Sequence, residues 1–374
     1  MALQLFVKTS RNENWQRFPG SNTMKVRVIG AGLIGTSIAL ALKQAGCTLQ
    51  MVDIDPVAQK LANKLVDGRE LDVVDVNIIS ADLANNKSLI LKALKENKES
   101  IVIDIASVKS NLLQEIAKLS ENCQNFVSSH PMAGREVGGG HSARADLFKG
   151  RAWIGIESDE TSQKARESLE YIVKSCGATL YWFSDKEHDE IVARISHLPQ
   201  VISSSLGNLI NESSGSSLNL AGQGLRDVIR LAASDAHFWS QLLIENANSV
   251  SLNIKQMINK MQQLDSLIES GNQDGISKFL IKANDGFKKI PGKHGLSPRN
   301  YALLSVVIND EAGQLAKIFN ECAEVQINIE DLSIEHSPGQ LTGLITLSVA
   351  EKDSQKLSDH LSACGWDVFQ VKSR

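Results

Sequence analysis

The chain has 374 residues, 42% hydrophobic and 22% charged, which is typical of a globular protein with a sizeable core. Its formal net charge of −4 comes from interspersed charges of both signs, which excludes an extended basic surface for nucleic acid or an anionic membrane. No apolar run reaches the roughly 18 residues that a membrane span requires. At roughly 100–200 residues for each domain, the length predicts two or three domains.

The five cysteines are dispersed and none forms a Cys-x-x-Cys pair. This distribution is typical of reduced thiols, so we expect a cytoplasmic protein without a disulfide framework. Residues 1–23 lack the apolar segment of a signal peptide. They form an extension with two interpretations, a disordered segment or an alternative start at Met24.

Short β-branched runs alternate with amphipathic stretches between residues 24 and 185. This alternation predicts an α/β domain with a mostly parallel sheet, of the dinucleotide-binding Rossmann type. The predicted strands are Val26–Ile29, Leu49–Val52, Val74–Ile79, Ile101–Ile105, Phe126–Ser128 and Trp153–Ile156.

A glycine-rich turn follows the first predicted strand and leads to a predicted helix over residues 37–45. The first glycine permits the tight turn, the second lets a pyrophosphate approach the backbone, and the third lets helix and strand pack closely. The amide groups at the start of the helix favour an anion. We predict that a dinucleotide binds at Gly30, Gly32, Leu33, Ile34 and Gly35.

Asp53 ends the second predicted strand, 18 positions after Gly35. Its carboxylate can accept hydrogen bonds from ribose hydroxyls and would repel a 2′-phosphate, so NAD is favoured over NADP. The next residues, Ile54-Asp55-Pro56, include no arginine. The alternative is that Asp53 is a solvated turn residue and that Asp55 binds the ribose.

Four separated segments carry the polar residues of a candidate reaction centre. Ser107 follows the fourth predicted strand and His130 follows the fifth, and ligands bind at such strand ends in open α/β sheets. The other two segments are Ser196-His197-Leu-Pro and the stretch that contains Arg226 and Arg230. We expect all four beside a bound nicotinamide.

This combination closely resembles the prephenate dehydrogenase family, with its arogenate dehydrogenase relatives. The resemblance covers residues 24–288, and its specific parts are Ser-His-Pro-Met-Ala-Gly-Arg-Glu at 129–136 and Ser-His-Leu-Pro at 196–199. It implies NAD-dependent oxidative decarboxylation of prephenate to 4-hydroxyphenylpyruvate in tyrosine biosynthesis. The corresponding reaction of arogenate, which yields tyrosine, is the alternative.

Two residues match the family's catalytic positions. His130 matches the histidine that takes the proton of the ring hydroxyl, and a reference pKa of about 6.5 suits that task. Ser107 matches the serine that orients the hydroxyl and the histidine. The alternatives are a loop histidine that caps backbone groups and a serine that caps a helix.

Four further residues match the substrate site of the family. Arg230 matches the arginine that pairs with the ring carboxylate, and Arg226 lies one helical turn away on the same face. His197 matches a substrate-site histidine, and Glu136 matches a glutamate that gates the pocket. The alternatives are solvated or interface arginines, a structural histidine and a surface glutamate, and His188 is expected to be structural.

No metal is expected in the reaction. The histidines His130, His141 and His197 lack the spacing of zinc ligands, and hydride transfer requires no Lewis acid.

One departure from the family concerns the cofactor, because Ser80-Ala81-Asp82 stands where Ala-Val-Pro is usual. An added carboxylate there would weaken NAD binding or change its pose.

Strand patterns are absent between residues 186 and 290, where Leu, Ile and Val recur at three- and four-residue spacing. This spacing predicts an all-α domain. The family uses the region as a two-fold interface, so the resemblance implies a homodimer. Residues 291–300 have the composition of a linker, with two prolines and two glycines in eight positions.

Residues 301–374 show the order β-α-β-β-α-β of a ferredoxin-like fold. They resemble an ACT domain, an amino-acid-sensing module, which implies feedback by tyrosine through Asn309, Gly313 and Leu315. The usual proline of the effector loop is replaced by Ala312, and the alternative is a dimerisation module that binds no effector. The predicted elements are Tyr301–Ile308, Gly313–Ala323, Ile327–His336, Leu341–Ala350, Ser354–Cys364 and Trp366–Val371.

Two rival functions are compatible with a nucleotide-binding domain followed by helices. A β-hydroxyacid dehydrogenase or a pyrroline-carboxylate reductase has a similar layout but does not explain the segment at 129–136. A non-catalytic dinucleotide sensor with an amino-acid-binding tail is the more distant alternative.

Overall fold

A computed structural model of the chain describes residues 23–120, 122–134, 139–212, 218–290, 301–309, 311–336 and 342–371. Almost all of the predicted extension, the predicted linker and Glu136 lie outside the described residues. The chain divides into two compact units. One comprises Met1–Ala221 and Leu225–Gln263, and the other comprises Gly222–Gly224 and Leu264–Arg374.

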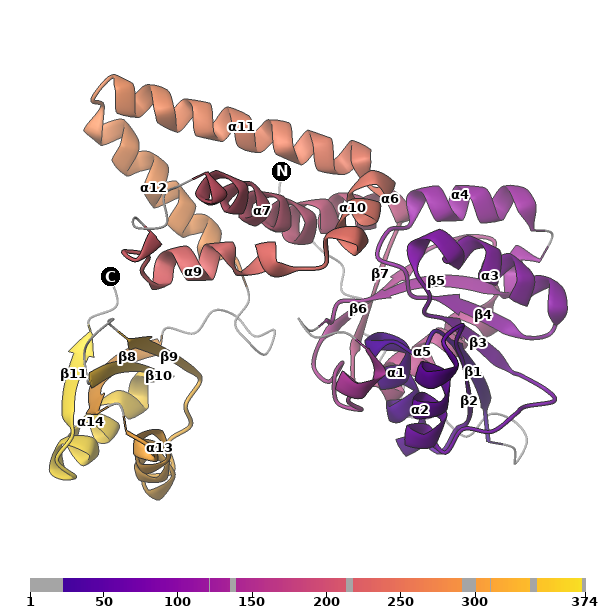
Figure 1. Cartoon of the computed structure of the whole chain (residues 1–374), viewed down its shortest axis with the longest axis horizontal. Coiled ribbons are helices and arrows are strands. Elements are labelled where there is room, and N and C mark those ends of the chain that lie inside the picture. The colour runs from indigo at the N-terminus through magenta and orange to yellow at the C-terminus, as the bar shows by residue number, and fades with distance from the viewer. Residues whose placement is uncertain are drawn as a thin grey trace. The chain divides into compact units, whose positions relative to one another are not determined.

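A seven-stranded sheet dominates the first unit, with the strand order β2-β1-β3-β4-β5-β6-β7 (Figure 1). All neighbouring strands pair in parallel except β5 and β6. The prediction of a mostly parallel sheet is therefore confirmed. The strands are β1 (Lys25–Ile29), β2 (Thr48–Val52), β3 (Val76–Ile79), β4 (Ile101–Asp104), β5 (Phe126–Pro131), β6 (Ala152–Ile156) and β7 (Thr179–Phe183).

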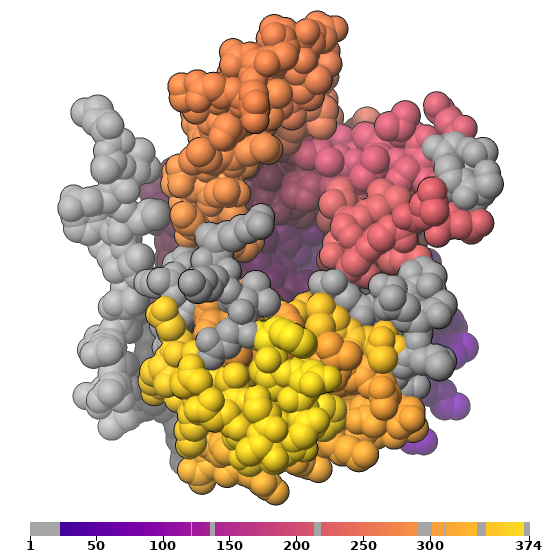
Figure 2. All heavy atoms as spheres, turned by 90° about the vertical axis from the view of Figure 1, so that its left-hand side faces the viewer, coloured from indigo at the N-terminus to yellow at the C-terminus, as the bar shows by residue number. Residues whose placement is uncertain are grey.

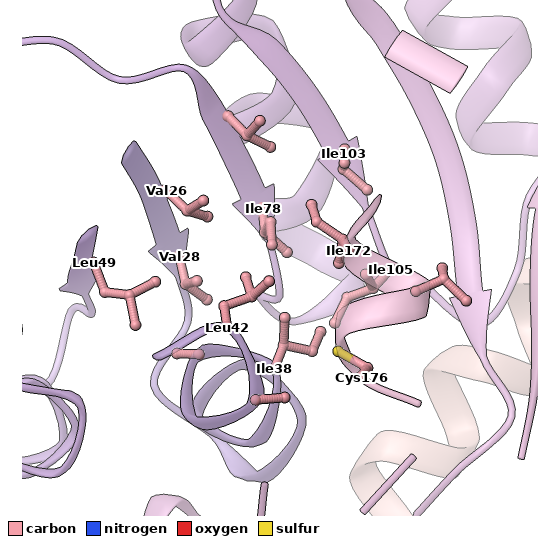
Figure 3. Packing of buried hydrophobic residues seen from close by; sticks show 14 of the residues in the cluster. Val26, Val28, Ile38, Leu42, Leu49, Ile78, Ile103, Ile105, Ile172 and Cys176 are labelled. Atoms are coloured by element: carbon pink, nitrogen blue, oxygen red, sulfur yellow. The ribbon is translucent and has the colours of Figure 1, made fainter. Parts of the chain in front are cut away.

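Helices cover both faces of this sheet. Ile38 and Leu42 of α1 point toward Val26, Val28 and Ile78 on the strands (Figure 3), and burial of each such side chain contributes about 1.5–3 kcal/mol. A second apolar cluster joins α3 and α4 to the other face. The helices are α1 (Leu33–Gln44), α2 (Pro56–Val66), α3 (Leu83–Glu96), α4 (Ser110–Leu119) and α5 (Gln163–Ser175), with short turns η1 (Cys123–Asn125) and η2 (Gly140–Ser142).

Three elements of the sheet domain differ from the sequence-based prediction. Strand β5 continues to Pro131, so His130 lies within the strand and not after it, because β5 pairs there with the antiparallel β6. Strand β7 was not predicted, and it is the edge strand of the sheet, without a fully buried side chain. Helix α1 begins at Leu33, directly at the glycine turn, and not at Ser37.

The rest of the first unit is helical, as predicted. Helix α6 starts with a capping box between Ser184 and Glu187, and a π-helical turn precedes Pro199 in α7. No helix among the described residues combines the length and the apolar character needed to cross a membrane. The elements are α6 (Asp185–Val192), η3 (Ala193–His197), α7 (Leu198–Asn211), α9 (Gln223–Ile229), η4 (Arg230–Ala233), α10 (Ala236–Glu245) and α11 (Ala247–Glu269).

The second unit contains the end of α11, helix α12 (Gln273–Phe287) and a four-stranded antiparallel sheet with the order β11-β8-β10-β9. Its elements follow the predicted order β-α-β-β-α-β, although β9 begins four residues later than expected. Ile318 and Leu361 anchor the two helices in the core beneath the sheet. The elements are β8 (Tyr301–Asn309), α13 (Gln314–Glu324), β9 (Asp331–His336), β10 (Thr342–Ala350), η5 (Glu351–Asp353), α14 (Ser354–Ala363) and β11 (Asp367–Val371).

Candidate functional site

The glycine turn after β1 leaves no room for side chains at two of its three glycines. A Cβ atom on Gly30, which has a φ of +109°, would lie 2.1 Å from the Ser80 backbone oxygen. A Cβ atom on Gly35 would lie 2.2 Å from the Gly30 oxygen. At Gly32 a Cβ atom would meet nothing within 4 Å. The first and third glycines therefore pack the turn, while the second leaves its backbone open to a ligand.

This turn lies at the point where the order of the strands in the sheet reverses. Strand β2 pairs on one side of β1 and β3 pairs on the other, and open α/β sheets bind ligands at such a switch point. Helix α1 starts here without a side-chain cap and without an acidic residue in its first turn. Its first amide groups and the positive end of its dipole are therefore suited to an anion.

Asp53 holds the glycine turn in place. Its Oδ2 accepts a hydrogen bond of 2.6 Å from the Ala31 amide, and its Oδ1 accepts one of 2.8 Å from the Asp55 amide. Asp55 is itself engaged, because its Oδ1 accepts the Val57 amide as the N-cap of α2. Each carboxylate oxygen of Asp53 can still accept a second hydrogen bond.

The segment that follows His130 returns to the glycine turn. A Cβ atom on Gly140 would lie 2.8 Å from the Ala31 oxygen, and the Arg144 amide donates to Ser37 Oγ of α1 at 3.0 Å. Gly140 and Arg144 therefore pack against the glycine turn and the first turn of α1. Glu136 lies outside the described residues.

A chain of hydrogen bonds runs from His130 into α6. His130 Nδ1 is 2.9 Å from His188 Nε2, and His188 Nδ1 is 2.8 Å from Asp189 Oδ1. His188 is fully buried and Asp189 almost so. His188, expected to be structural, is therefore the direct partner of the predicted base.

The carboxylate of Asp189 also anchors α4. Its two oxygens accept the Lys109 and Ser110 amides at 3.0 and 2.8 Å. Lys109 occupies the N-cap position of α4, so Ser107 is not the helix cap that the alternative required. Ser107 lies half-buried in the loop between β4 and α4.

A buried ion pair fixes the same loop. The Nζ atom of Lys109 donates to Asp104 Oδ2 at 2.8 Å, and neither side chain is exposed. Asp104 also accepts hydrogen bonds from the Ala106 amide and from the Ser128 hydroxyl. Such a pair costs desolvation but defines one geometry, here the path of the backbone around Ser107.

The electrostatics of the network determine the tautomers of both histidines. Burial acts to raise the pKa of Asp189, but hydrogen bonds from His188 and Ser110 outweigh it and the pKa falls, so Asp189 is a carboxylate that only accepts. His188 Nδ1 must then donate, and its Nε2 accepts the Nδ1 proton of His130. The lone pair of His130 therefore lies on Nε2.

All three histidines of the network are neutral near pH 7. Burial, and then repulsion from His188 in its protonated form and from the charge of Lys109, lower the pKa of His130 well below its usual value. Burial also lowers the pKa of His188, although Asp189 opposes it. The pKa of His197 falls to about 4, chiefly through burial. A neutral imidazole is the form that accepts a proton.

His197 is linked to the same network through Asn246. The Nδ2 atom of Asn246 donates to the Asp189 backbone oxygen at 2.8 Å and lies 3.3 Å from His197 Nδ1. The indole of Trp239 packs edge-on against the His197 ring, with 6.0 Å between the ring centres. The structure therefore brings together two of the predicted histidines that are 67 positions apart.

The segment of Arg230 is held against α7, the helix that follows His197. Gln200 Nε2 donates to the Leu231 backbone oxygen at 2.8 Å, and the Ala232 amide donates to Ser203 Oγ at 3.0 Å. Arg230 is exposed and begins the turn η4. Because α9 ends at Ile229, Arg226 and Arg230 do not lie on one continuous α-helix, contrary to the prediction.

The predicted effector residues lie at the end of β8 and the start of α13. Gly313 has a φ of +91° and precedes the helix in a left-handed conformation that favours glycine. Leu315 packs against the core of the second unit, and Asn309 ends β8 with an exposed side chain.

Two family models match this chain. The one described as "Prephenate dehydrogenase, nucleotide-binding domain" matches residues 38–182. The one described as "Prephenate dehydrogenase, dimerization domain" matches residues 184–282. The two adjacent matches cover well over half of the chain.

Individual proteins show the same similarity. A protein named "Probable prephenate dehydrogenase NovF" from Streptomyces niveus is 27% identical over 357 residues, which cover 91% of this chain and 98% of that protein. The structure of prephenate dehydrogenase from A. aeolicus in complex with hydroxyphenyl propionate and NAD⁺ shares the fold, with a TM-score of 0.66, 23% identity and coverage of 71% and 98%. Synechocystis arogenate dehydrogenase has a TM-score of 0.63, 25% identity and coverage of 71% and 99%.

Proposed function

The chain belongs to the prephenate dehydrogenase family, and we propose that it converts prephenate to 4-hydroxyphenylpyruvate by NAD-dependent oxidative decarboxylation. The observation that carries the proposal is the hydrogen-bonded chain from His130 through His188 to Asp189. It presents a neutral imidazole at the carboxyl end of the same sheet that carries the glycine turn. A sensor without catalysis would have no use for a base prepared in this way.

The residues around the glycine turn fit NAD. The open backbone at Gly32 and the uncapped start of α1 suit the pyrophosphate, and Asp53 retains acceptor capacity for the ribose hydroxyls. Asp82, the departure noted in the sequence, is exposed at the N-cap of α3. Bound NAD supplies an acceptor for the hydride that leaves the ring carbon.

We assign the proton transfer to His130. Its Nε2 lone pair accepts the proton of the ring hydroxyl as the ring carbon that bears this hydroxyl loses its hydride. The bond to the ring carboxylate then breaks and carbon dioxide leaves. The electron pair completes the aromatic ring, and the ring oxygen takes the proton back from His130 to give 4-hydroxyphenylpyruvate. His188 and Asp189 keep His130 in the tautomer that can act, and Ser107 is proposed to orient the hydroxyl.

The substrate is a dianion, so the site must offer positive charge to bind it. We assign Arg230 to the ring carboxylate, because a guanidinium forms bidentate pairs and stays charged. The contacts of Gln200 and Ser203 hold its segment against α7. His197, Arg226 and Glu136 are also proposed to belong to the substrate site.

One experiment decides between the alternatives for the substrate. Purified protein is mixed with NAD and either prephenate or arogenate, and NADH formation is followed by absorbance. We expect faster turnover of prephenate. A higher rate with arogenate would select the alternative that the similarity to the Synechocystis enzyme supports. No NADH from either compound would leave the dinucleotide sensor as the function.

We also propose a domain division and a homodimer. Residues 24–185 form the nucleotide-binding domain and residues 186–290 form the domain for substrate binding and dimerisation. The matches to the two family models over 38–182 and 184–282 support this division and the dimer.

Residues 301–374 are proposed to act as an ACT domain that binds tyrosine near Gly313. The support is the order of strands and helices and the left-handed glycine before α13. Tyrosine at millimolar concentration is added to the prephenate assay, with phenylalanine as the control. If tyrosine neither inhibits the enzyme nor binds in calorimetry, this segment is a module without an effector.

A further inference from the structure

Three side chains with metal-binding atoms meet at α13 and α14 in the second unit. Glu321 Oε2 lies 2.8 Å from His360 Nε2 and 3.1 Å from Cys364 Sγ, and the last two atoms are 3.8 Å apart. Within the part of the chain that the structure describes, this is the one group of three such side chains whose ligand atoms all lie within 4.8 Å.

These spacings fit a single ion held by all three atoms. Zinc binds histidine nitrogen and carboxylate oxygen at about 2.0–2.2 Å and thiolate sulfur at about 2.3 Å. In a tetrahedral arrangement, bonds of these lengths place the donor atoms about 3.3–3.6 Å apart. The nitrogen–oxygen pair at 2.8 Å would have to open by about 0.5–0.7 Å, and the other two distances would change by about 0.5 Å or less.

The packing of the helices brings the ligands together. His360 and Cys364 are four positions apart at the end of α14, so they lie on one face. Cys322 and Leu361, the neighbours of Glu321 and His360 in sequence, are buried in the core. The three ligands lie at the rim of this packing, and the Cys364 side chain is exposed, so an ion can enter.

We propose that Glu321, His360 and Cys364 bind a divalent transition-metal ion of the zinc class. A set of one nitrogen, one oxygen and one sulfur suits such borderline ions, whereas calcium and magnesium prefer oxygen alone. On binding, Cys364 releases its thiol proton to solvent. The thiolate and the Glu321 carboxylate then balance the two positive charges, and water completes the fourth position.

Without an ion, the three side chains bind one another through a proton. The Glu321 carboxylate accepts the thiol proton and raises the pKa of Cys364, so the sulfur stays protonated until an ion displaces the proton. Glu324 lies one turn further along α13, and its charge also acts on Cys364. Figure 2 shows the segment that carries α14 and β11 in yellow, at the surface that faces the viewer.

Cobalt(II) tests the site, because its bond to a thiolate gives a charge-transfer absorption in the near ultraviolet. The full-length chain is stripped with a chelator and titrated with cobalt(II), and zinc(II) is then added as competitor. We expect one cobalt ion per chain, a thiolate band, and loss of the band on addition of zinc. Absence of the band in the unmodified chain would overturn the proposal.

Variants assign the ligands. Cys364→Ser is expected to remove the thiolate band, and His360→Ala to weaken cobalt binding at least tenfold. Cys123→Ser, which removes a thiol of the first unit, is the matched control and should leave the titration unchanged. A band that persists in Cys364→Ser would refute the site. Because Cys364 is exposed, its replacement should leave the circular dichroism spectrum unaltered, which confirms that the variant is folded.

Discussion

At the scale of single residues, the chemistry proposed for His130 depends on residues that are distant in sequence. His188 lies 58 positions away and holds its Nδ1, while the carboxylate of Asp189 orients His188. Burial alone would lower the pKa of an imidazole without deciding which nitrogen carries the proton. The hydrogen-bond chain makes that decision and leaves Nε2 as the basic atom.

Replacement of His130 by asparagine tests this role. His130→Asn keeps a polar side chain but removes the base, so we expect kcat for NADH formation to fall about 10²–10⁴-fold with little change in KM. His141→Asn, at an exposed histidine of η2, is the matched control and should retain its rate. Near-normal turnover in His130→Asn would remove the residue from the mechanism.

The pH dependence of the rate follows from the lowered pKa of His130. A base must be neutral to act, and its folded-state pKa lies well below 6.5, so it stays active as the pH falls through 6.5. We expect the acid limb of kcat/KM to fall below pH 6.5, measured with saturating NAD. An acid limb at or above pH 6.5 would show that the imidazole is not desolvated as the structure indicates.

At the scale of elements, the glycine turn separates packing from ligand access. Gly35→Ala places a methyl group against the Gly30 backbone, so we expect the free energy of unfolding to fall by about 1–3 kcal/mol. In Gly32→Ala the added methyl group meets no atom of the protein, so we expect the melting temperature of the variant to stay unchanged while its NAD binding weakens. Thermal unfolding and NAD titration measure both variants, and equal losses of stability would contradict the distinction.

The sequence predicts those elements whose signals are local. The run that became β1, the glycine turn and the strand end at Asp53 all carry their pattern within a few residues, and the structure has each of them. Strand β7 escaped prediction because it is a short edge strand whose side chains are only partly covered. The end of β5 also escaped, because its last residues are ordered by pairing with β6.

The candidate site follows the same rule. His130, His197 and Ser107 can be named because each stands in a short motif. The contact between His130 and His188 has no such motif, since it arises from packing of α6 against the sheet domain. An adjacent His188-Asp189 pair at the start of a helix was the available signal, but one sequence cannot show which distant residue it contacts.

At the scale of the whole molecule, the helical domain exposes apolar side chains that a dimer would cover. Ile258 and Met261 of α11 are 47% and 57% exposed in the single chain, and they are three positions apart on one helical face. Both lie in the segment that matches the dimerization domain. Exposed apolar side chains of this kind are expected at contacts between subunits.

The double variant Ile258→Glu/Met261→Glu therefore tests the proposed dimer. Burial of two such side chains contributes about 3 kcal/mol or more, so their replacement by carboxylates should raise the dimer Kd at least ~100-fold. Sedimentation should then show a dimer for the unmodified chain and a monomer for the double variant. Asn259→Glu adds a charge to the same helix on a different face and should remain dimeric. A double variant that sediments as a dimer would place the contact between subunits away from this part of α11.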